Sequence, residues 1–506
     1  MKTRKRIDSW IKKIKEHPGI YFLLFLILVG AFFVRIYRIG TLLGFYYDQG
    51  RDALVIWDLW HKGKFFLIGP TTGIEGVFRG PWYYWLIAPF YILGQGSPVA
   101  PSVFLSASTV AAIFLSYKMG EKLAGKWAGI LAVLIGSFSY HLVLASRWLS
   151  NPTGMFLISM LFVGSLLLVL EGKAWAWIAV AGLAGLAMQF GSATEVFYFL
   201  AIAILAVYLF FQDRKKLPDL KTIIFSLLAM GITVAPQVLF DLRHQGILRG
   251  TVSRFLFEED SFKLSFWEIA KIRFPFYYDV FFSKLFPSFA KAKDAYALIL
   301  GVLVFYNIRT VLKDKRFVLL IILLLSPLAG MLFFQGNYGN VYDYYFTGYY
   351  LIFVIFFAAV LVLFSQTIIG KVIIIVFLFL FLKDNLPLVK NYIISSVDGP
   401  TTIVLGNEKQ VIDWIYEDAD GDDFNTDVYV PPVIPYAYDY LFKWYGGIVH
   451  GKEPIEEQIS LLYTIYEADP PHPDRLEAWL ERQAGIGRVE EEAKFGGITV
   501  QRRSRL

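Results

Sequence analysis

The fold of this chain is decided by residues 20–53, which read IYFLLFLILVGAFFVRIYRIGTLLGFYYDQGRDA. Residues 20–38 form an apolar segment long enough for a helix to cross a lipid bilayer. The segment ends on Arg35 and Arg38 without a small-residue cleavage site, so we predict a retained membrane anchor rather than a signal peptide. Two aspartates and an arginine follow among aromatic residues, which places ionisable groups at a membrane surface.

Further apolar runs continue along the chain. The 506 residues are 56% hydrophobic and only 18% charged, a balance typical of a protein with most of its length in lipid. We therefore predict an all-α polytopic membrane protein with about eleven transmembrane helices. They are expected at residues 20–38, 100–118, 127–145, 153–170, 174–190, 195–211, 221–240, 295–311, 317–335, 346–365 and 370–384.

Two features of the composition exclude other classes of protein. The chain has no cysteine, which excludes disulfide bonds, thiolate catalysis and cysteine-ligated zinc. Its net charge of +6 suits contact with anionic lipid. The basic residues are scattered among short loops, so nucleic acid is not a predicted partner.

Lysine and arginine indicate the orientation in the membrane. Residues 1–19 form a basic amphipathic segment, and the short loops 213–221 and 309–316 are also basic, so all three are predicted to be cytoplasmic. An odd number of spans then puts the C-terminus outside. The predicted parts are this segment, a transmembrane domain at 20–385 with a first outer loop at 39–99, and an extracytoplasmic domain at 386–506.

The composition changes from about Thr401 onward. Acidic residues become frequent, and mixed patterns replace the apolar runs, which indicates a small α/β domain. Helices are predicted within 411–416 and 475–483, and strands within 427–430 and 497–502.

Two short helices are predicted in the outer loop 39–99. Residues 82–93 are apolar but too short to span, so this helix should lie along the interface or re-enter the membrane. Residues 52–62 have helical spacing with Asp52 directly before the apolar period, which is typical of a helix N-cap.

Asp48 is the main candidate for chemistry. It follows an outer helix end and is flanked by aromatic residues. A carboxylate near an apolar interface can act as a general base that takes a proton from a hydroxyl or amine. The alternative is an ordinary solvated loop aspartate or a helix cap.

Other polar side chains fall at the same outer boundary under this orientation. Each has an ordinary alternative. The arginines could anchor the chain at the membrane interface or extend their charged ends to it, and the tyrosines could belong to an aromatic belt. Glu195 could be a charge that stabilises the start of a helix, and Arg243 could pair with Asp241. Because all of them share one membrane face, we predict a substrate site. The candidates are Arg51, Arg79, Tyr83, Arg147, Gln189, Glu195, Arg243, His244 and Tyr345.

The outer-loop motifs resemble the glycosyltransferase C superfamily. Residues 48–53 (DQGRDA) look like its Asp-Glu-x-x-Tyr-Ala motif, and residues 79–86 (RGPWYYWL) look like its Lys-Pro-Pro-Leu-x-x-Trp-Leu motif. Gln49 stands in place of the usual second acidic residue, and Arg79 in place of the lysine. The likeness extends over about residues 20–380 and is greatest to bacterial relatives of protein O-mannosyltransferases and the lipid A aminoarabinose transferase.

The resemblance implies an inverting sugar transferase. Its donor would be a polyprenyl-phosphate sugar, and its acceptor a lipid, protein or polysaccharide outside the cell membrane. Asp48 would deprotonate the acceptor, and some of Arg79, Arg147, Arg243 and His244 would offset the charge of the leaving phosphate. No cofactor is certain, and a divalent cation is left open.

Two alternatives remain from the residues themselves. A secondary transporter or lipid flippase would need polar or broken helices at mid-membrane, usually in two related halves. A non-catalytic polysaccharide assembly protein would use the C-terminal domain for binding and would not require Asp48.

Overall fold

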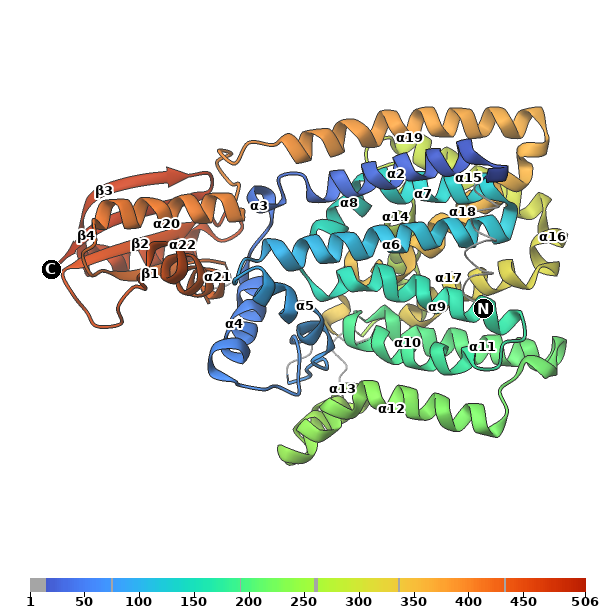
Figure 1. Cartoon of the computed structure of the whole chain (residues 1–506), viewed down its shortest axis with the longest axis horizontal. Helices are drawn as coiled ribbons and strands as arrows, with labels where there is room; N and C mark the ends of the chain where they lie inside the picture. The colour runs from blue at the N-terminus through green and yellow to red at the C-terminus, as the bar shows by residue number, and fades with distance from the viewer. Residues whose placement is uncertain (1–14, 74–75, 192, 259–262, 335–336, 432–433) are drawn as a thin grey trace.

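Helices along most of the chain form a bundle, with a small sheet domain at one end (Figure 1). The computed structural model describes residues 15–73, 76–191, 193–258, 263–334, 337–431 and 434–506. Most of the predicted basic segment 1–19 lies outside these residues.

The apolar helices lie where the spans were predicted. Among the described residues, eight helices are long and apolar enough to cross a membrane, or nine if a bent pair is counted as one span. The long ones contain α2 (Pro18–Ile36), α6 (Val99–Ala124), α9 (Met155–Leu170), α11 (Phe197–Gln212), α12 (Leu220–Arg243), α17 (Lys315–Phe333), α18 (Thr347–Leu363) and α19 (Ile368–Ile394). The shorter α10 (Ala176–Phe190) and α15 (Ala290–Tyr306) correspond to the remaining two predicted spans.

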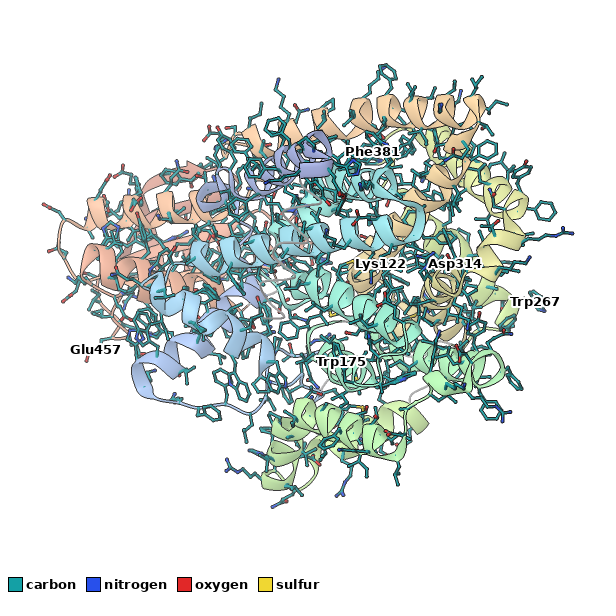
Figure 2. All side chains as sticks on the ribbon, turned by 45° about the vertical axis from the view of Figure 1, so that its right-hand side comes forward. Lys122, Trp175, Trp267, Asp314, Phe381 and Glu457 are labelled. Atoms are coloured by element: carbon teal, nitrogen blue, oxygen red, sulfur yellow. The ribbon has the colours of Figure 1, made fainter. Side chains whose placement is uncertain are left out.

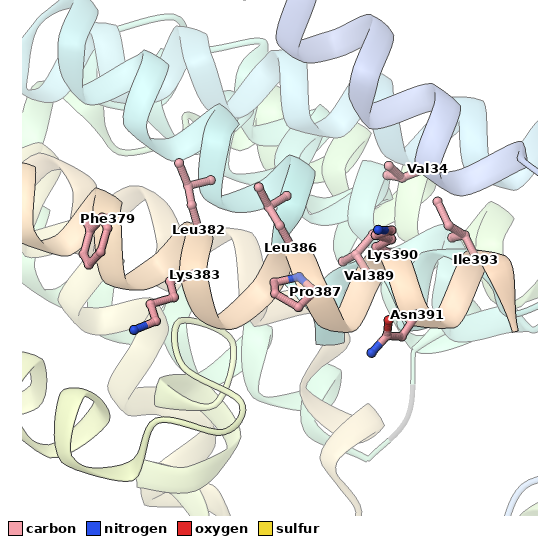
Figure 3. Close-up of a pocket in the computed structure, with 10 residues that line it drawn as sticks. All are labelled: Val34, Phe379, Leu382, Lys383, Leu386, Pro387, Val389, Lys390, Asn391 and Ile393. Carbon is pink, nitrogen blue, oxygen red and sulfur yellow. The ribbon is translucent and has the colours of Figure 1, made fainter.

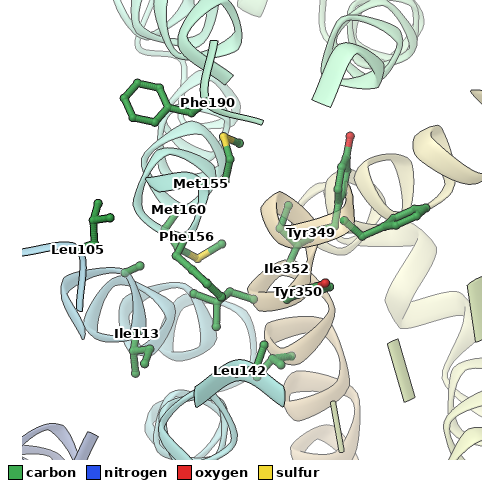
Figure 4. Packing of buried hydrophobic residues seen from close by; sticks show 14 of the residues in the cluster. Leu105, Ile113, Leu142, Met155, Phe156, Met160, Phe190, Tyr349, Tyr350 and Ile352 are labelled. Carbon is green, nitrogen blue, oxygen red and sulfur yellow. The ribbon is translucent and has the colours of Figure 1, made fainter. Parts of the chain in front are cut away.

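Helix α18 forms the centre of the bundle. It is apolar on every side, as a helix surrounded by others must be, and nearly all of its side chains are buried. Figure 4 shows Tyr349, Tyr350 and Ile352 of α18 packed beside Met155 and Phe156 of α9.

The bent pair differs from the continuous span predicted at 127–145. Helix α7 (Lys126–Phe138) and helix α8 (Tyr140–Arg147) meet at Ser139 with a bend of 62°. Backbone groups released by a break inside a membrane must find partners in the protein. Arg35 donates to the carbonyls of Gly136 (2.9 Å) and Ser137 (3.0 Å), and Asn385 accepts from the amide of Tyr140 (2.8 Å). These partners come from distant helices, so local sequence does not reveal the break.

The two ends of the bundle differ in character. One end carries α4 (Tyr47–Lys62), α5 (Trp82–Leu93), α3 (Ile39–Leu42) and the sheet domain, whereas the α11–α12 connection and α16 (Ile308–Lys313) lie at the other (Figure 1). Lys122 and Asp314 lie near each other at this second end, away from Glu457 of the sheet domain (Figure 2). Helices α13 (Ile247–Phe257) and α14 (Phe266–Phe282) complete the helical part.

The C-terminal domain is α/β, as predicted. Its sheet has the strand order β1-β2-β4-β3, with β1 parallel to β2 and the other pairs antiparallel. The elements are α20 (Leu405–Ala419), β1 (Asn425–Tyr429), α21 (Tyr436–Leu441), the π-helical η7 (Phe442–His450), β2 (Leu461–Glu467), α22 (Pro473–Ala484), β3 (Gly487–Phe495) and β4 (Ile498–Arg505).

This domain packs directly on helix α4. Gly50 lies so close to the backbone of Tyr436 and Ala437 in α21 that an added Cβ would overlap it. The amide of Leu405 also donates to the carbonyl of Leu43 over 2.8 Å. A glycine is therefore required where α21 crosses α4, and the contact fixes the helix that carries Asp48.

Candidate functional site

Helix α4 presents Asp48 in its first turn. The helix begins at Tyr47, where the Gln49 side-chain oxygen accepts from the Tyr46 amide (3.1 Å) and its nitrogen donates to the Leu149 carbonyl (3.1 Å). The N-terminus of a helix favours a carboxylate in this position. The prediction that Asp52 caps a helix at 52–62 is wrong, because the helix begins five residues earlier and Asp52 is buried in its second turn.

Arg51 joins two carboxylates that differ in exposure. It forms ion pairs with Asp48 (2.9 Å) and Asp52 (2.7 Å), whose side chains are 55% and 6% exposed. Asp52 also accepts from the Tyr84 hydroxyl over 2.7 Å. Burial raises the pKa of Asp52 to about 6 although Arg51 and Tyr84 oppose the shift. Asp48 is thus the accessible carboxylate of the pair. Asp52 holds the Arg51 guanidinium from the buried side.

The loop between α4 and α5 brings Arg79 close to the bundle. Arg51 donates to the Thr71 hydroxyl (2.8 Å), and Thr71 pairs with Phe78 in an isolated β-bridge beside Arg79. The Gly80 amide donates to the Gln189 side chain over 2.6 Å, and Arg79 donates to the Met188 carbonyl over 3.4 Å. Predicted residues Arg79 and Gln189 therefore lie together at the end of α10.

Glu195 and Tyr345 belong to the same group. Burial lowers the pKa of Arg79, and the charge of Glu195 acts in the opposite direction. Glu195 is fully buried and accepts from the Gly348 amide over 3.4 Å. Thr194, its neighbour in η2 (Thr194–Val196), donates to the carbonyl of Tyr345 in η5 (Asp343–Phe346). We call Arg79, Gln189, Glu195 and Tyr345 the Arg79 cluster.

Short connections link Asp48 to this cluster. Gln49, next to Asp48, is bonded to Leu149, and the ring of the adjacent Trp148 meets Tyr344 edge-on with centroids 5.5 Å apart. Asn151, in η1 (Asn151–Gly154), donates to the Phe190 carbonyl over 2.7 Å. The ends of α4, α9, α10 and α18 that lie on the side of the sheet domain are thus joined around one region.

Arg147 has a different environment. It is buried, and it donates to the carbonyls of Val34, Arg35 and Tyr37, each at 3.0 Å, at the end of α2. Its guanidinium also lies over the ring of Tyr392 at 5.2 Å. These contacts stabilise the C-terminus of a helix, a role that cations commonly take.

Three other predicted residues form no hydrogen bond or ion pair with the Arg79 cluster in the part of the chain that the structure describes. Arg243 and His244 are exposed at the end of α12, where His244 stacks on Phe240 with ring centroids 4.0 Å apart. The predicted partner of Arg243, Asp241, instead accepts from the amides of Leu248 (2.8 Å) and Arg249 (3.2 Å). Tyr83 is fully buried on α5, with its ring edge-on to Phe190. Their roles as substrate ligands remain predictions.

The structure adds residues that the sequence did not single out. Lys284 is buried and pairs with Asp343 (2.7 Å), which also accepts from the Tyr350 hydroxyl (2.9 Å), so the turn bearing Tyr345 is held in place. The pair is separated by 59 residues, and only the fold brings it together. Within the described part of the chain, no three His, Cys, Asp or Glu side chains form a group that could hold a metal ion.

Comparison with known proteins identifies the fold. No family model matches the sequence, and no curated protein does. ArnT from Cupriavidus metallidurans in the apo state has a TM-score of 0.60 at 12% identity, covering 96% of this chain and 98% of that one. ArnT bound to undecaprenyl phosphate gives 0.58 at 12% identity, covering 96% and 97%. The Archaeoglobus fulgidus oligosaccharyltransferase gives 0.45 at 12% identity, covering 94% and 73%.

Proposed function

We propose that this chain, which has the polytopic membrane fold of the glycosyltransferase C superfamily, is an inverting glycosyltransferase. The single observation that supports this most is the accessible carboxylate of Asp48, paired with Arg51 and linked to the Arg79 cluster at one end of the bundle. An exposed base beside fixed cations is what displacement of a phosphate by a hydroxyl or amine requires.

The proposed reaction uses Asp48 as the general base. Asp48 takes the proton from the acceptor hydroxyl or amine, whose electron pair forms a bond to the anomeric carbon of the sugar. The bond from this carbon to the phosphate oxygen breaks on the opposite face, so the configuration inverts. The electron pair leaves with the polyprenyl phosphate, and the Arg79 guanidinium offsets its charge.

The difference between the two ends of the bundle supports a side of the membrane for the site and, with it, a class of donor. Basic loops at 213–221 and 309–316 favour a cytoplasmic position, so Asp48 and the C-terminal domain are assigned to the outside. A lipid-linked donor suits this side, because its tail stays in the bilayer and its phosphate lies at the surface. The undecaprenyl phosphate bound to ArnT supports this class of lipid. The acceptor is a lipid, a protein or a polysaccharide.

An Asp48→Asn variant tests the assignment. Loss of a general base typically costs about 10²–10⁴-fold in rate, so transfer from a panel of synthetic polyprenyl-phosphate sugars should fall by at least about 100-fold. Asp58→Asn is the matched control, since Asp58 lies on the same helix and pairs with nearby Lys62 and Lys64. Full transfer by Asp48→Asn would overturn the mechanism. Lipid flipping without transfer by the unaltered chain would instead support a flippase.

A further inference from the structure

A groove on the outside of the bundle carries two lysines, one of which, Lys383, lies 6.0 Å from the centre of the Phe379 ring. It has a volume of about 760 Å³ and lies along α19, with Val34 of α2 at its edge (Figure 3). Apolar side chains such as Leu382 and Leu386 form most of its lining, and Lys383 and Lys390 supply its charge. In the described structure neither lysine has an ion pair or a hydrogen bond, and no carboxylate lines the groove.

The depth of the lysines follows from their place on the helix. Helix α19 ends at Ile394, so Lys390 lies about 6 Å and Lys383 about 16 Å from its outer end, at a rise of 1.5 Å per residue. The opposite side of the helix faces the bundle, where Asp384 accepts from the amides of Ser288 (3.1 Å) and Phe289 (3.0 Å). These contacts fix the rotation of the helix, and both lysines are exposed on its surface.

A lysine in this position is costly without a nearby anion. Lysine side chains at the edge of a bilayer extend toward the headgroups, where phosphates compensate their charge. Lys383 and Lys390 are two turns apart, about 10.5 Å along the axis, a separation that two extended side chains can close on one phosphate. The spacing therefore allows one anionic group to contact both lysines.

Pro387 lies between the two lysines and changes the backbone there. Proline has no amide hydrogen, so the carbonyl of Lys383, four residues earlier, lacks its usual helical donor. The groove thus combines two cations, a backbone carbonyl without its usual helical donor and an apolar wall. This set matches a headgroup with a phosphate and a hydroxyl, attached to acyl chains.

We propose that the groove binds one anionic glycerophospholipid of the leaflet on the side of the C-terminal domain. Its phosphate lies between Lys383 and Lys390, a headgroup hydroxyl donates to the Lys383 carbonyl, and its acyl chains follow Leu386 and Val34. The site is separate from the Arg79 cluster, which lies among α10, α11 and α18 rather than α2 and α19. The bound lipid seals the gap between the first and last spans and does not take part in sugar transfer.

The test compares lipid retention by the full chain. The protein is reconstituted in phosphatidylcholine nanodiscs with or without phosphatidylglycerol, and the lipid kept after delipidation is counted by native mass spectrometry. The variant Lys383→Gln/Lys390→Gln should retain phosphatidylglycerol about 25-fold more weakly, about fivefold for each lysine near the surface. The matched control is Lys221→Gln/Lys371→Gln, which removes two exposed lysines at the other end of the bundle.

Three outcomes would overturn the proposal. They are unchanged retention in both the variant and the control, equal loss in both, or loss of polyprenyl phosphate from the double variant while phosphatidylglycerol stays bound. A second measurement uses the unaltered chain, in case the variant does not fold. Photoactivatable phosphatidylglycerol should label peptides containing Leu382–Ile393, and labelling confined to other helices would refute the site.

Discussion

Arg51 and Asp48 are joined across one turn of α4 by an ion pair of 2.9 Å, and the same guanidinium holds the buried Asp52 at 2.7 Å. The arginine thereby connects an exposed carboxylate to the packed interior of the loop. Without it, Asp52 would be a buried charge with no cation beside it, which a folded protein rarely tolerates.

Replacing Arg51 should affect stability and transfer differently according to the substitute. Arg51→Gln leaves Asp52 unpaired and should lower the free energy of unfolding by about 3 kcal/mol. Arg51→Lys keeps a charge but not the planar fork that meets both carboxylates, so it should fold while transfer falls. Thermal unfolding and a transfer assay separate the two effects. Unchanged stability in Arg51→Gln would contradict the role given to this arginine.

Gly50→Ala should loosen the C-terminal domain. The added Cβ would overlap the backbone of Tyr436 and Ala437, and backbone cannot move aside as a side chain can. We expect faster proteolysis of residues 395–404, which connect α19 to α20, together with weaker transfer. Gly301→Ala is the control, because nothing lies near the position of its Cβ on α15. Equal proteolysis of the two variants would refute the contact.

Stability should depend on pH through Glu467. Burial raises the pKa of Glu467 to about 7 from 4.5, although a hydrogen bond from Tyr438 opposes the shift. The folded chain then binds the proton more tightly than the unfolded chain. This stabilisation is complete below pH 4.5 and is lost as the pH rises toward 7, by about 3 kcal/mol.

The variant Glu467→Gln isolates this effect. It cannot lose a proton, so thermal unfolding should show a flatter decline between pH 4.5 and 7 than in the unaltered chain. Glu408, buried in α20, shifts its pKa in the same direction because of burial and the nearby Glu467, so some pH dependence should remain. A rise in stability over this range would contradict the assignment.

Gln189 should determine how well the donor binds. Its side chain accepts a hydrogen bond from the Gly80 amide over 2.6 Å. Removal of that side chain leaves the buried Gly80 amide without an acceptor, at a cost of about 1–3 kcal/mol. Gln189→Ala should therefore displace Arg79 and raise the KM for the donor by about tenfold or more. Gln212→Ala, at the exposed end of α11, is the control. An unchanged KM would show that the loop does not depend on this contact.

Much of the helical fold was predictable because a membrane span depends on local composition. Each predicted span coincides with a helix, although α15 at the predicted span 295–311 is not among those long and apolar enough to cross a membrane. The helix 82–93 has the predicted bounds. The break at Ser139 was not predictable, since its partners, Arg35 and Asn385, come from the first and last spans. In the C-terminal domain, β3 was missed because its exposed acidic residues lack the alternation typical of a strand.

The candidate site was predictable in part. Arg79, Gln189, Glu195 and Tyr345 were grouped by membrane face alone, and the fold brings them together. The position of Arg147 was not foreseen, because its partners are backbone carbonyls that carry no sequence signal. Asp52 was taken for a cap because the apolar period begins after it, whereas the helix extends back through a polar turn to Tyr47.

The bond between Tyr140 and Asn385 has a consequence for biogenesis. The amide of Tyr140 enters the membrane with the third span, but its acceptor belongs to the last one, 245 residues later. During synthesis the Tyr140 amide therefore lacks this acceptor until the final helix has left the translocon. The last helix therefore completes the bundle, and a chain that stops before residue 385 would lack the acceptor for the Tyr140 amide.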